Sequence, residues 1–375
     1  MNSHKRFKII FLNQLLLLLC AMMQIQAQEP ASLVFFADHT RIPGYACRKA
    51  GDPIMFQGNH KKKNYFEGWY FKMVSADGTS RLSVIPGISL SDNKKEQHAF
   101  IQIIDGITAQ TWYYTFPVEE FSFSRKSFSI RIGNNYFSAD SVSLNIQNDS
   151  IMTRGCIRMS GQVPFPSGRI LNPGIMGWYR FVPFMQCYHG VVSLTHELSG
   201  KIYHGGSTYS FDGGKGYIEK DWGRSMPSAW IWMQSNQFTN ENSSFMLSVA
   251  NIPWLGKSFT GFLGFLWLDS TLYRFATYTH ARISILESGQ DHVKINIRDK
   301  RNRYEIMAVR KGSGLLKAPV KGGMDRRIPE SIDAGIRLTL SDMKGTTLFV
   351  DSTSIAGLEI VGDQQIIMKI KPFSH

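Results

Sequence analysis

"NYFEGWYFKMVSADGTSRLSVIPGISL", residues 64–90, holds two runs rich in aromatic and β-branched residues on either side of the short polar segment "SADGTS". Runs of this length bounded by Gly, Asp and Ser predict two strands joined as a hairpin. One carboxylate, Glu67, lies in the first run among aromatic side chains. A carboxylate in such a setting must be paired, hydrogen-bonded or shifted in pKa.

The same pattern continues along the chain. Short segments that alternate apolar and polar residues follow one another, such as "HAFIQIIDG" (98–106), "SVSLNIQ" (141–147) and "HVKINIRDK" (292–300). Gly, Asn, Asp or Pro separates them, and no long stretch has the helical period. The chain is therefore predicted to be all-β, with few or no helices. Its many short strands exceed one small sandwich and favour two closed or nearly closed antiparallel barrels packed together.

A short internal echo suggests where one barrel ends and the next begins. "YFEGWY" (65–70) and "YIEKDW" (217–222) share an aromatic residue, a Glu and a Trp in nearly the same order. If each stands at the head of a strand series, the first barrel comprises residues 65–215 and the second residues 216–375. An N-terminal extension, residues 28–64, precedes them.

Residues 1–27 have the features of a signal peptide. A basic start is followed by an apolar stretch over residues 9–23, which is too short to span a bilayer comfortably, and Ala27 offers a small residue for cleavage. The prediction is an exported protein, periplasmic or secreted. Cys20 leaves open a lipid anchor formed by acylation of that residue.

The charge of the chain does not identify a nucleic-acid-binding protein. The 375 residues carry a formal net charge of +13, but the basic residues are spread along the chain. No recognition motif accompanies them, so no nucleic-acid partner is expected. Attraction of a cationic surface to anionic lipid, and thus association with a membrane surface, stays open.

Cysteines and histidines provide no metal-binding pattern. After removal of the leader, Cys47, Cys156 and Cys187 remain, an odd number without the spacing of a zinc site. His189 and His196 each lack a second histidine at ligand spacing. The sequence predicts neither a metal site nor a cofactor.

Several longer motifs together resemble the tocopherol cyclase family. They are "NYFEGWYFK", "HAFIQII", "GWYRFVPFMQCYHG", "YIEKDWGRSMPSAWIWMQSNQF", "GLLKAPVKGG" and "GLEIVG", in this order from residue 64 to near the C-terminus. The resemblance implies two lipocalin-like β-barrels that share a lipophilic site, related to carotenoid hydratase-like proteins. It also implies a lipophilic small molecule as substrate, such as a prenylated quinol or polyene, and a proton-initiated cyclisation, hydration or isomerisation without a cofactor.

Such a reaction needs a carboxylic acid that protonates an alkene, with aromatic faces around the cation that results. Glu67 is the leading candidate for the acid; the alternative is a buried Glu that closes the barrel end through an ion pair. Asp221 and Arg224 flank Trp222 and are expected to pair across a turn, either as electrostatic partners in catalysis or as a structural cap.

The candidate substrate-binding residues come from several predicted strands. Trp230, Trp232 and Gln234 share one strand face and Ala229, Ile231 and Met233 the other, so the Trp face forms either a cation-stabilising wall or core packing. Tyr188 and His189 are interpreted as a proton relay or as structural residues, and Gln102 as a hydrogen-bond partner inside the first barrel. The full set is Trp69, Tyr70, Gln102, Tyr188, His189, Trp222, Trp232 and Gln234.

A binding protein is the rival interpretation. The same barrels would then carry a lipid or quinone without changing it, and export favours that role. Turnover after substitution of the acid separates the two hypotheses, because a carrier needs no proton donor.

Overall fold

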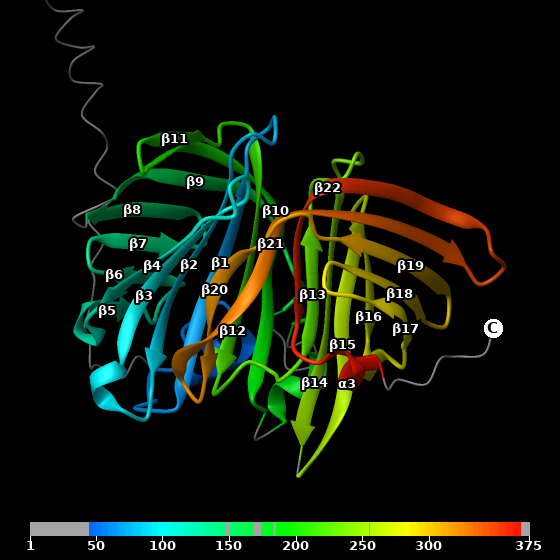
Figure 1. The fold of residues 1–375 in the computed structure, drawn as a ribbon, viewed down its shortest axis with the longest axis horizontal. Helices are drawn as coiled ribbons and strands as arrows, with labels where there is room; N and C mark the ends of the chain where they lie inside the picture. Colours follow the sequence, from blue (N-terminus) through cyan, green and yellow to red (C-terminus); the bar gives the residue numbers. More distant parts are fainter. Residues whose placement is uncertain (1–44, 148–150, 168–173, 183–184, 255, 369–375) are drawn as a thin grey trace, which may run out of the picture. The chain divides into compact units, whose positions relative to one another are not determined.

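A computed structural model describes residues 45–147, 151–167, 174–182, 185–254 and 256–368 (Figure 1). Within these ranges almost all regular structure is β-strand, which confirms the all-β prediction. The predicted signal peptide, with Ala27 and Cys20, lies outside the described residues. In the described part of the chain, no helix is both long and apolar enough to cross a bilayer.

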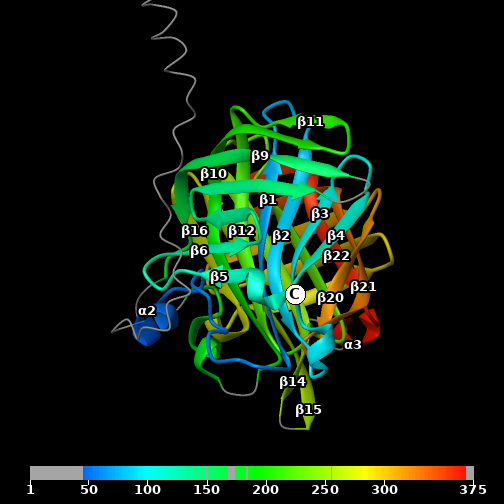
Figure 2. The ribbon, with the colours of Figure 1, turned by 90° about the vertical axis from the view of Figure 1, so that its left-hand side faces the viewer.

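The first sheet has twelve strands in the order β4-β3-β2-β1-β12-β10-β9-β8-β7-β6-β5, with β11 paired to β10. All its pairs are antiparallel, and the sheet curls into a nearly closed barrel whose β3 contacts β6. Figure 2 shows this curling of the sheet: β9 and β6 cross the direction of β1 and β2 at a steep angle. The strands are β1 (Tyr65–Val74), β2 (Arg81–Leu90), β3 (His98–Asp105), β4 (Thr111–Phe116), β5 (Phe121–Phe123), β6 (Ser129–Ile132), β7 (Asn135–Ser138), β8 (Ser141–Gln147), β9 (Met152–Pro164), β10 (Cys187–His204), β11 (Ser207–Ser210) and β12 (Gly214–Gly223).

The second sheet has ten strands in the order β16-β15-β14-β13-β22-β21-β19-β18-β17, with β20 paired to β21. It is also antiparallel throughout and appears in green to red in Figure 1. The strands are β13 (Trp230–Ser235), β14 (Ser243–Trp254), β15 (Lys257–Leu268), β16 (Thr271–Ala276), β17 (Arg282–Ser288), β18 (His292–Arg298), β19 (Asn302–Val309), β20 (Gly314–Val320), β21 (Gly323–Asp342) and β22 (Thr347–Val361).

Helical structure in the described residues is short and lies between or after strands. The α-helices are α2 (Tyr45–Gly51), before the first sheet, and α3 (Gln364–Met368), after the second. The 3₁₀ helices are η1 (Lys94–Glu96), η2 (Val118–Glu120), η3 (Gly177–Phe181) and η4 (Thr277–Thr279).

The internal echo of the sequence has a different structural meaning from the one predicted. Strand β12 crosses the predicted boundary at residue 216 and belongs to the first sheet, so the chain passes to the second sheet between Gly223 and Trp230. The two echoed motifs are neighbouring antiparallel strands, with Glu67 opposite Trp222 and Trp69 opposite Lys220. Glu67 of one motif and Lys220 of the other form an ion pair inside the first barrel, which a local comparison of motifs does not reveal.

Alternation along each strand separates three hydrophobic cores. Trp69 and Phe71 of β1 point into the first barrel, whereas Ile231 of β13 points into the second. The opposite faces of the same strands meet in a third core, which includes Tyr70 and Trp232. Because side chains alternate with period two, each of these strands serves a barrel interior and the space between the sheets at once.

Candidate functional site between the two sheets

A cavity of about 190 Å³ opens in the third core. Residues from β1, β3, β10 and β12 of the first sheet and from β13, β14, β21 and β22 of the second line it, and most of them are apolar. Six acidic or basic residues interrupt this apolar lining: His189, Glu219, Asp221, Lys317, Glu330 and Glu359. An apolar cavity with a few convergent polar groups is the usual form of a small-molecule site.

Glu330 and Glu359 form a carboxyl pair in this cavity. They stand directly opposite each other on β21 and β22, and their side chains hydrogen-bond. Burial raises the pKa of Glu330 to about 7 even though Tyr70 donates to its carboxyl group at 2.6 Å. Burial and the neighbouring Glu330 raise the pKa of Glu359 well above its usual range, and Trp230 Nε1 donates to it. Two adjacent buried carboxyls hold a proton between them near neutral pH.

Glu219 is a third buried carboxyl group with aromatic donors. Tyr217 donates its hydroxyl to Glu219 Oε2 at 2.7 Å, and Trp232 donates Nε1 to the same oxygen at 3.2 Å. Burial outweighs the attraction of His189 and raises the pKa of Glu219 to about 7. The three carboxyls thus each accept a hydrogen bond from an aromatic residue that also lines the apolar region.

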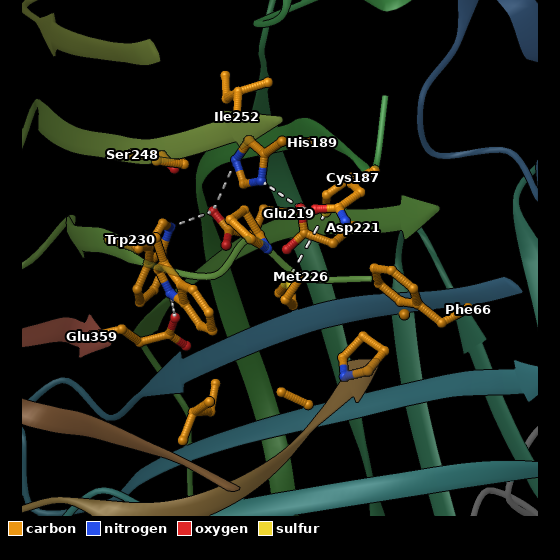
Figure 3. A pocket seen from close by; sticks show the side chains of 18 of the residues that line it. Phe66, Cys187, His189, Glu219, Asp221, Met226, Trp230, Ser248, Ile252 and Glu359 are labelled. Atoms are coloured by element: carbon orange, nitrogen blue, oxygen red, sulfur yellow. Dashed lines mark hydrogen bonds and ion pairs between the residues drawn. The ribbon is translucent and has the colours of Figure 1, made fainter. Parts of the chain in front are cut away.

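His189 lies between the two carboxylates of β12. Its Nδ1 is 2.9 Å from Asp221 Oδ1 and its Nε2 is 3.6 Å from Glu219 Oε2, as Figure 3 shows. Burial alone would lower the pKa of His189, but Asp221 and Glu219 together raise it to about 9. An imidazolium therefore sits beside the carboxyl cluster at neutral pH and provides a hydrogen-bond donor for a polar ligand group.

The ligating atoms of His189, Glu219 and Asp221 lie within 4.8 Å of one another, a spacing at which three side chains could hold a metal ion. Spacing along the sequence could not indicate this group, because β10 contributes the histidine and β12 the two acids. The observed hydrogen bonds, however, already engage Nδ1 with Asp221 and Glu219 Oε2 with Tyr217 and Trp232. The donor set fits a hydrogen-bonded charge relay better than a first coordination shell.

Comparison with known proteins places the chain in a family. The sequence profile described as tocopherol cyclase-like matches residues 145–362, more than half of the chain. This protein belongs to the tocopherol cyclase-like family. A protein named probable tocopherol cyclase, chloroplastic, from Oryza sativa subsp. japonica is 24% identical over 198 residues, which are 50% of this chain and 42% of the rice protein. Tocopherol cyclase, chloroplastic, from Zea mays is 28% identical over 74 residues, 20% of this chain and 16% of the maize protein. The matched region thus spans less than half of these relatives.

A solved structure shares the fold at low sequence identity. A crystal structure of CghA superposes with a TM-score of 0.50 and 11% identity, covering 80% of this chain and 89% of that one. Kievitone hydratase from Nectria haematococca gives 0.44 and 10%, covering 79% and 89%. The fold is the two-barrel lipocalin-like architecture that the family resemblance implies.

Glu67 lies on the other face of β1, away from this cavity. Its Oε1 is 2.5 Å from Lys220 Nζ, both side chains are fully buried, and Tyr65 also donates to the carboxylate. Backbone N–H groups of Gln57 and Gly58 complete its shell at 2.9–3.0 Å. Each carboxylate oxygen has at least two partners, as the alternative interpretation of a barrel-closing ion pair requires, and Glu67 does not line the cavity.

The three tryptophans of the predicted substrate-binding set separate into two groups. Trp69 and Trp222 lie in the first barrel's core, where Lys220 Nζ is 4.7 Å and 5.0 Å from their ring centroids. They sandwich the ammonium of the ion pair and do not line the cavity. Trp232 does line it and contacts Tyr70 edge-on at 5.5 Å between ring centroids.

Asp221 and Arg224 do not form the expected pair. The Asp221 carboxylate binds His189, whereas the Arg224 side chain is exposed and lies outside the cavity. Residues three apart in an extended chain project to opposite faces, which prevents a direct contact. Arg180 instead lies over the Trp222 ring, 5.4 Å from its centroid.

The side chains of Tyr188 and His189 also point in different directions and have different partners. Tyr188 stacks on Trp222 at 5.6 Å between ring centroids and donates its hydroxyl to Val182 O at 3.0 Å, so it does not extend a relay from His189. His189 points into the cavity. Adjacent residues of a strand face opposite sides, and here the sides are two different compartments.

The two predicted glutamines link the sheets. Gln102 lines the cavity, on the outer face of the first barrel and not inside it, and exchanges two hydrogen bonds with the Lys317 backbone at 2.6 and 3.1 Å. Gln234 is fully buried and accepts from Lys72 Nζ at 2.8 Å. Burial lowers the pKa of Lys72 to about 7 against the attraction of Glu330 and Glu219.

Three residues of the site were not predicted as such: Glu219, Glu330 and Glu359. Each is an acid that directly follows an apolar residue, in "YIEKDW", "RIPESI" and "GLEIVG". That local pattern was the one available signal. Glu67 has the same pattern, so the sequence could not distinguish a carboxylate that pairs with a lysine from one that does not.

Proposed function

We propose that this protein catalyses a proton-initiated addition to an alkene of a lipophilic substrate, closing a ring or adding water. The observation that carries the proposal is the Glu330–Glu359 carboxyl pair, which retains a proton near neutral pH inside an apolar cavity. Trp230 and Trp232 flank it with aromatic faces that stabilise a carbocation. Membership of the tocopherol cyclase-like family supports the same class of chemistry.

In the proposed reaction, Glu359 is the proton donor, since it has the more strongly raised pKa and is the less buried member of the pair. Its proton adds to one alkene carbon and leaves a tertiary cation on the other. A phenol oxygen of the same molecule attacks this cation and then loses its own proton to a carboxylate, so the product has the substrate's mass. Attack by water gives an alcohol heavier by one water molecule.

His189 and Asp221 are the proposed partners of the polar end of the substrate. The imidazolium donates a hydrogen bond to the phenol oxygen, and Asp221 accepts the proton released on ring closure. In this proposal Asp221 acts with His189, in place of the Arg224 expected from the sequence, and serves as a proton acceptor.

A prenylated hydroquinone is the proposed substrate class. The rice and maize relatives are named tocopherol cyclases, and an apolar cavity with a polar cluster at one side suits a molecule with a long apolar tail and a phenolic head. With the predicted signal peptide, the proposal places the reaction outside the cytoplasm.

The test incubates purified protein with a prenylated hydroquinone and follows products by chromatography and mass spectrometry. Unchanged mass in a new peak supports cyclisation, and a gain of one water supports hydration. Glu359→Gln should lower turnover about 10²- to 10⁴-fold, the usual contribution of a general acid, while Glu305→Gln, on the exposed face of β19, should not change it. Binding without conversion, equal in Glu359→Gln, would instead identify a carrier.

A further inference from the structure

A second pocket, of about 680 Å³, lies beside the first barrel where α2, η3 and the ends of β1, β10 and β12 meet. We call it the basic pocket. Among the described residues that line it, none is acidic and six carry basic side chains: Lys49, His60, Lys61, Lys63, Arg180 and Arg224. So many basic groups around one concave surface concentrate positive potential there.

Among the described residues, acidic groups neutralise only part of this charge, and Asp52 and Glu67 attract Arg180. Lys63 pairs with Asp92 at 2.8 Å. Lys49 Nζ instead binds neutral oxygens, Gln57 O at 3.1 Å and Asn59 Oδ1 at 2.6 Å. The nearby Glu67 is already engaged by Lys220, so its charge is balanced inside the barrel.

Mutual repulsion is visible within the basic pocket. Burial lowers the pKa of His60, and Lys49 and Lys61 lower it further. Burial also lowers the pKa of Lys49, with Lys61 adding to the effect and Glu67 opposing it. A bound anion would relieve this repulsion.

The basic pocket adjoins the apolar cavity. Met185 lines both. Apolar surface on the basic side comes from Tyr188, Trp222 and Phe181, the last of which is 53% exposed. A molecule with a charged head and an apolar chain would find the head site and the chain site side by side.

We propose that the basic pocket binds the phosphate head group of a single-chain amphiphile whose apolar chain passes Met185 into the cavity. Arg180 is held over the Trp222 ring, 5.4 Å from its centroid, and its Nη2 donates to Lys49 O at 2.6 Å, so its guanidinium is preorganised. Guanidinium and ammonium groups together recognise phosphate through charge-assisted hydrogen bonds. Free phosphate has the same head-group chemistry, and the chain distinguishes the two ligands.

Calorimetric titration of the intact protein tests this with three probes: inorganic phosphate, dodecyl phosphate and dodecyl maltoside, the last two below their micellar concentrations. Dodecyl phosphate should bind at least about tenfold tighter than inorganic phosphate because its chain is buried, and dodecyl maltoside should bind more weakly than dodecyl phosphate. Equal affinity of phosphate and dodecyl phosphate would overturn the chain's path into the cavity. Equal affinity of the two dodecyl probes would overturn the head-group site.

Charge-reversed variants locate the site. Lys61→Glu/Arg224→Glu changes two exposed residues of the basic pocket, and Lys300→Glu/Arg301→Glu makes the same charge change on exposed residues between β18 and β19 of the second sheet. The first should weaken dodecyl phosphate binding at least about tenfold and the second less than about threefold, because screening suppresses distant charges. Equal losses in both variants would mean that general surface charge, not the basic pocket, binds the probe.

Blocking the passage at Met185 between the basic pocket and the cavity distinguishes binding of the head group from binding of the chain. Met185→Trp should lower the affinity for dodecyl phosphate towards that of inorganic phosphate and leave inorganic phosphate binding unchanged. An unchanged affinity for dodecyl phosphate would show that its chain lies elsewhere. Since these probes contain neither alkene nor phenol, their binding is independent of the proposed catalytic reaction, and each proposal can fail without the other.

Discussion

Glu67 and Glu359 are chemically identical acids whose neighbours assign them different tasks. Glu67 faces an ammonium group 2.5 Å away, together with backbone donors, and forms an ion pair. Glu359 faces another carboxyl group, Glu330, and a tryptophan N–H. A positive partner keeps the charge of a buried acid, whereas a like partner makes it hold a proton.

The ion pair predicts a large stability effect at Glu67. Glu67→Gln leaves the fully buried Lys220 ammonium without its counter-charge, which costs about 3–5 kcal/mol of unfolding free energy. The double variant Glu67→Gln/Lys220→Met should recover much of this loss, because no unpaired charge remains. Urea unfolding measures both variants. A loss below about 1 kcal/mol in Glu67→Gln would contradict the structural assignment.

The carboxyl pair predicts a pH dependence of opposite sign to that of an ordinary buried ion pair. Burial raises the pKa of Glu330 from 4.5 to about 7, so between these values the folded state keeps a proton that the unfolded state has released. Its contribution to stability is therefore present below pH 4.5 and is lost as the pH rises through about 7. Glu330→Gln should make the unfolding free energy less dependent on pH in this window.

The measurement is denaturant unfolding of wild type, Glu330→Gln and Glu305→Gln at several pH values from 4.5 to 7, the range of the Glu330 shift. Glu305→Gln, at the exposed face of β19, serves as the control and should keep the wild-type slope. Identical slopes in wild type and Glu330→Gln would show that Glu330 does not bind the extra proton.

At the scale of the element, each central strand has two differently occupied faces. On β13, Ile231 is buried in the second barrel's core and Trp232 faces the cavity. On β12, Lys220 belongs to the ion pair inside the first barrel and Glu219 to the cavity. A shift of one residue in the register of these strands would exchange core and site.

Because the two faces of β13 have different surroundings, substitutions of adjacent residues on this strand should affect stability and turnover differently. Ile231→Ala should cost about 2–5 kcal/mol of unfolding free energy, because it leaves a void in a closed core. Trp232→Phe keeps a ring but removes the N–H that binds Glu219, so it should lower turnover more than stability. Denaturation measures the stability of both variants, and product assays measure their turnover. The contrast would be contradicted if the two variants lost the same stability and the same turnover.

At the scale of the whole molecule, polar contacts bind the two sheets to each other. Arg81 pairs with Asp333 at 2.7 Å, and Tyr70 donates to Glu330 at 2.6 Å. The third core adds apolar contacts from both sheets around the cavity. Since the cavity is built from both sheets, neither barrel alone presents a complete site.

The shared core predicts that the barrels unfold together. Thermal unfolding followed by far-UV circular dichroism and by the near-UV signal of the cavity aromatics should give one coincident transition. Arg81→Ala/Asp333→Ala should lower the midpoint without splitting the transition, because the third core remains. Two separate transitions in the wild type would contradict this coupling.

Local pattern was sufficient to predict the architecture. Alternation in segments such as "SVSLNIQ" and turn residues between them specify strands, because backbone sterics and burial of one face act over a few residues. The faces of β13 could be divided for the same reason: Trp232 and Ile231 do lie on opposite sides. The ordered motifs added the family and its two-barrel fold.

Long-range pairing decided the rest. Whether a lone Glu between apolar residues meets Lys220, as Glu67 does, or a second carboxyl, as Glu359 does, depends on which strand lies opposite, and β1 pairs with β12 across some 150 residues of chain. His189 likewise meets Asp221 only through the pairing of β10 with β12. By itself the sequence determined strands, faces and family, because these follow from neighbours in the chain. The tertiary structure decided which acids hold charge and which hold protons, because electrostatics depends on neighbours in space.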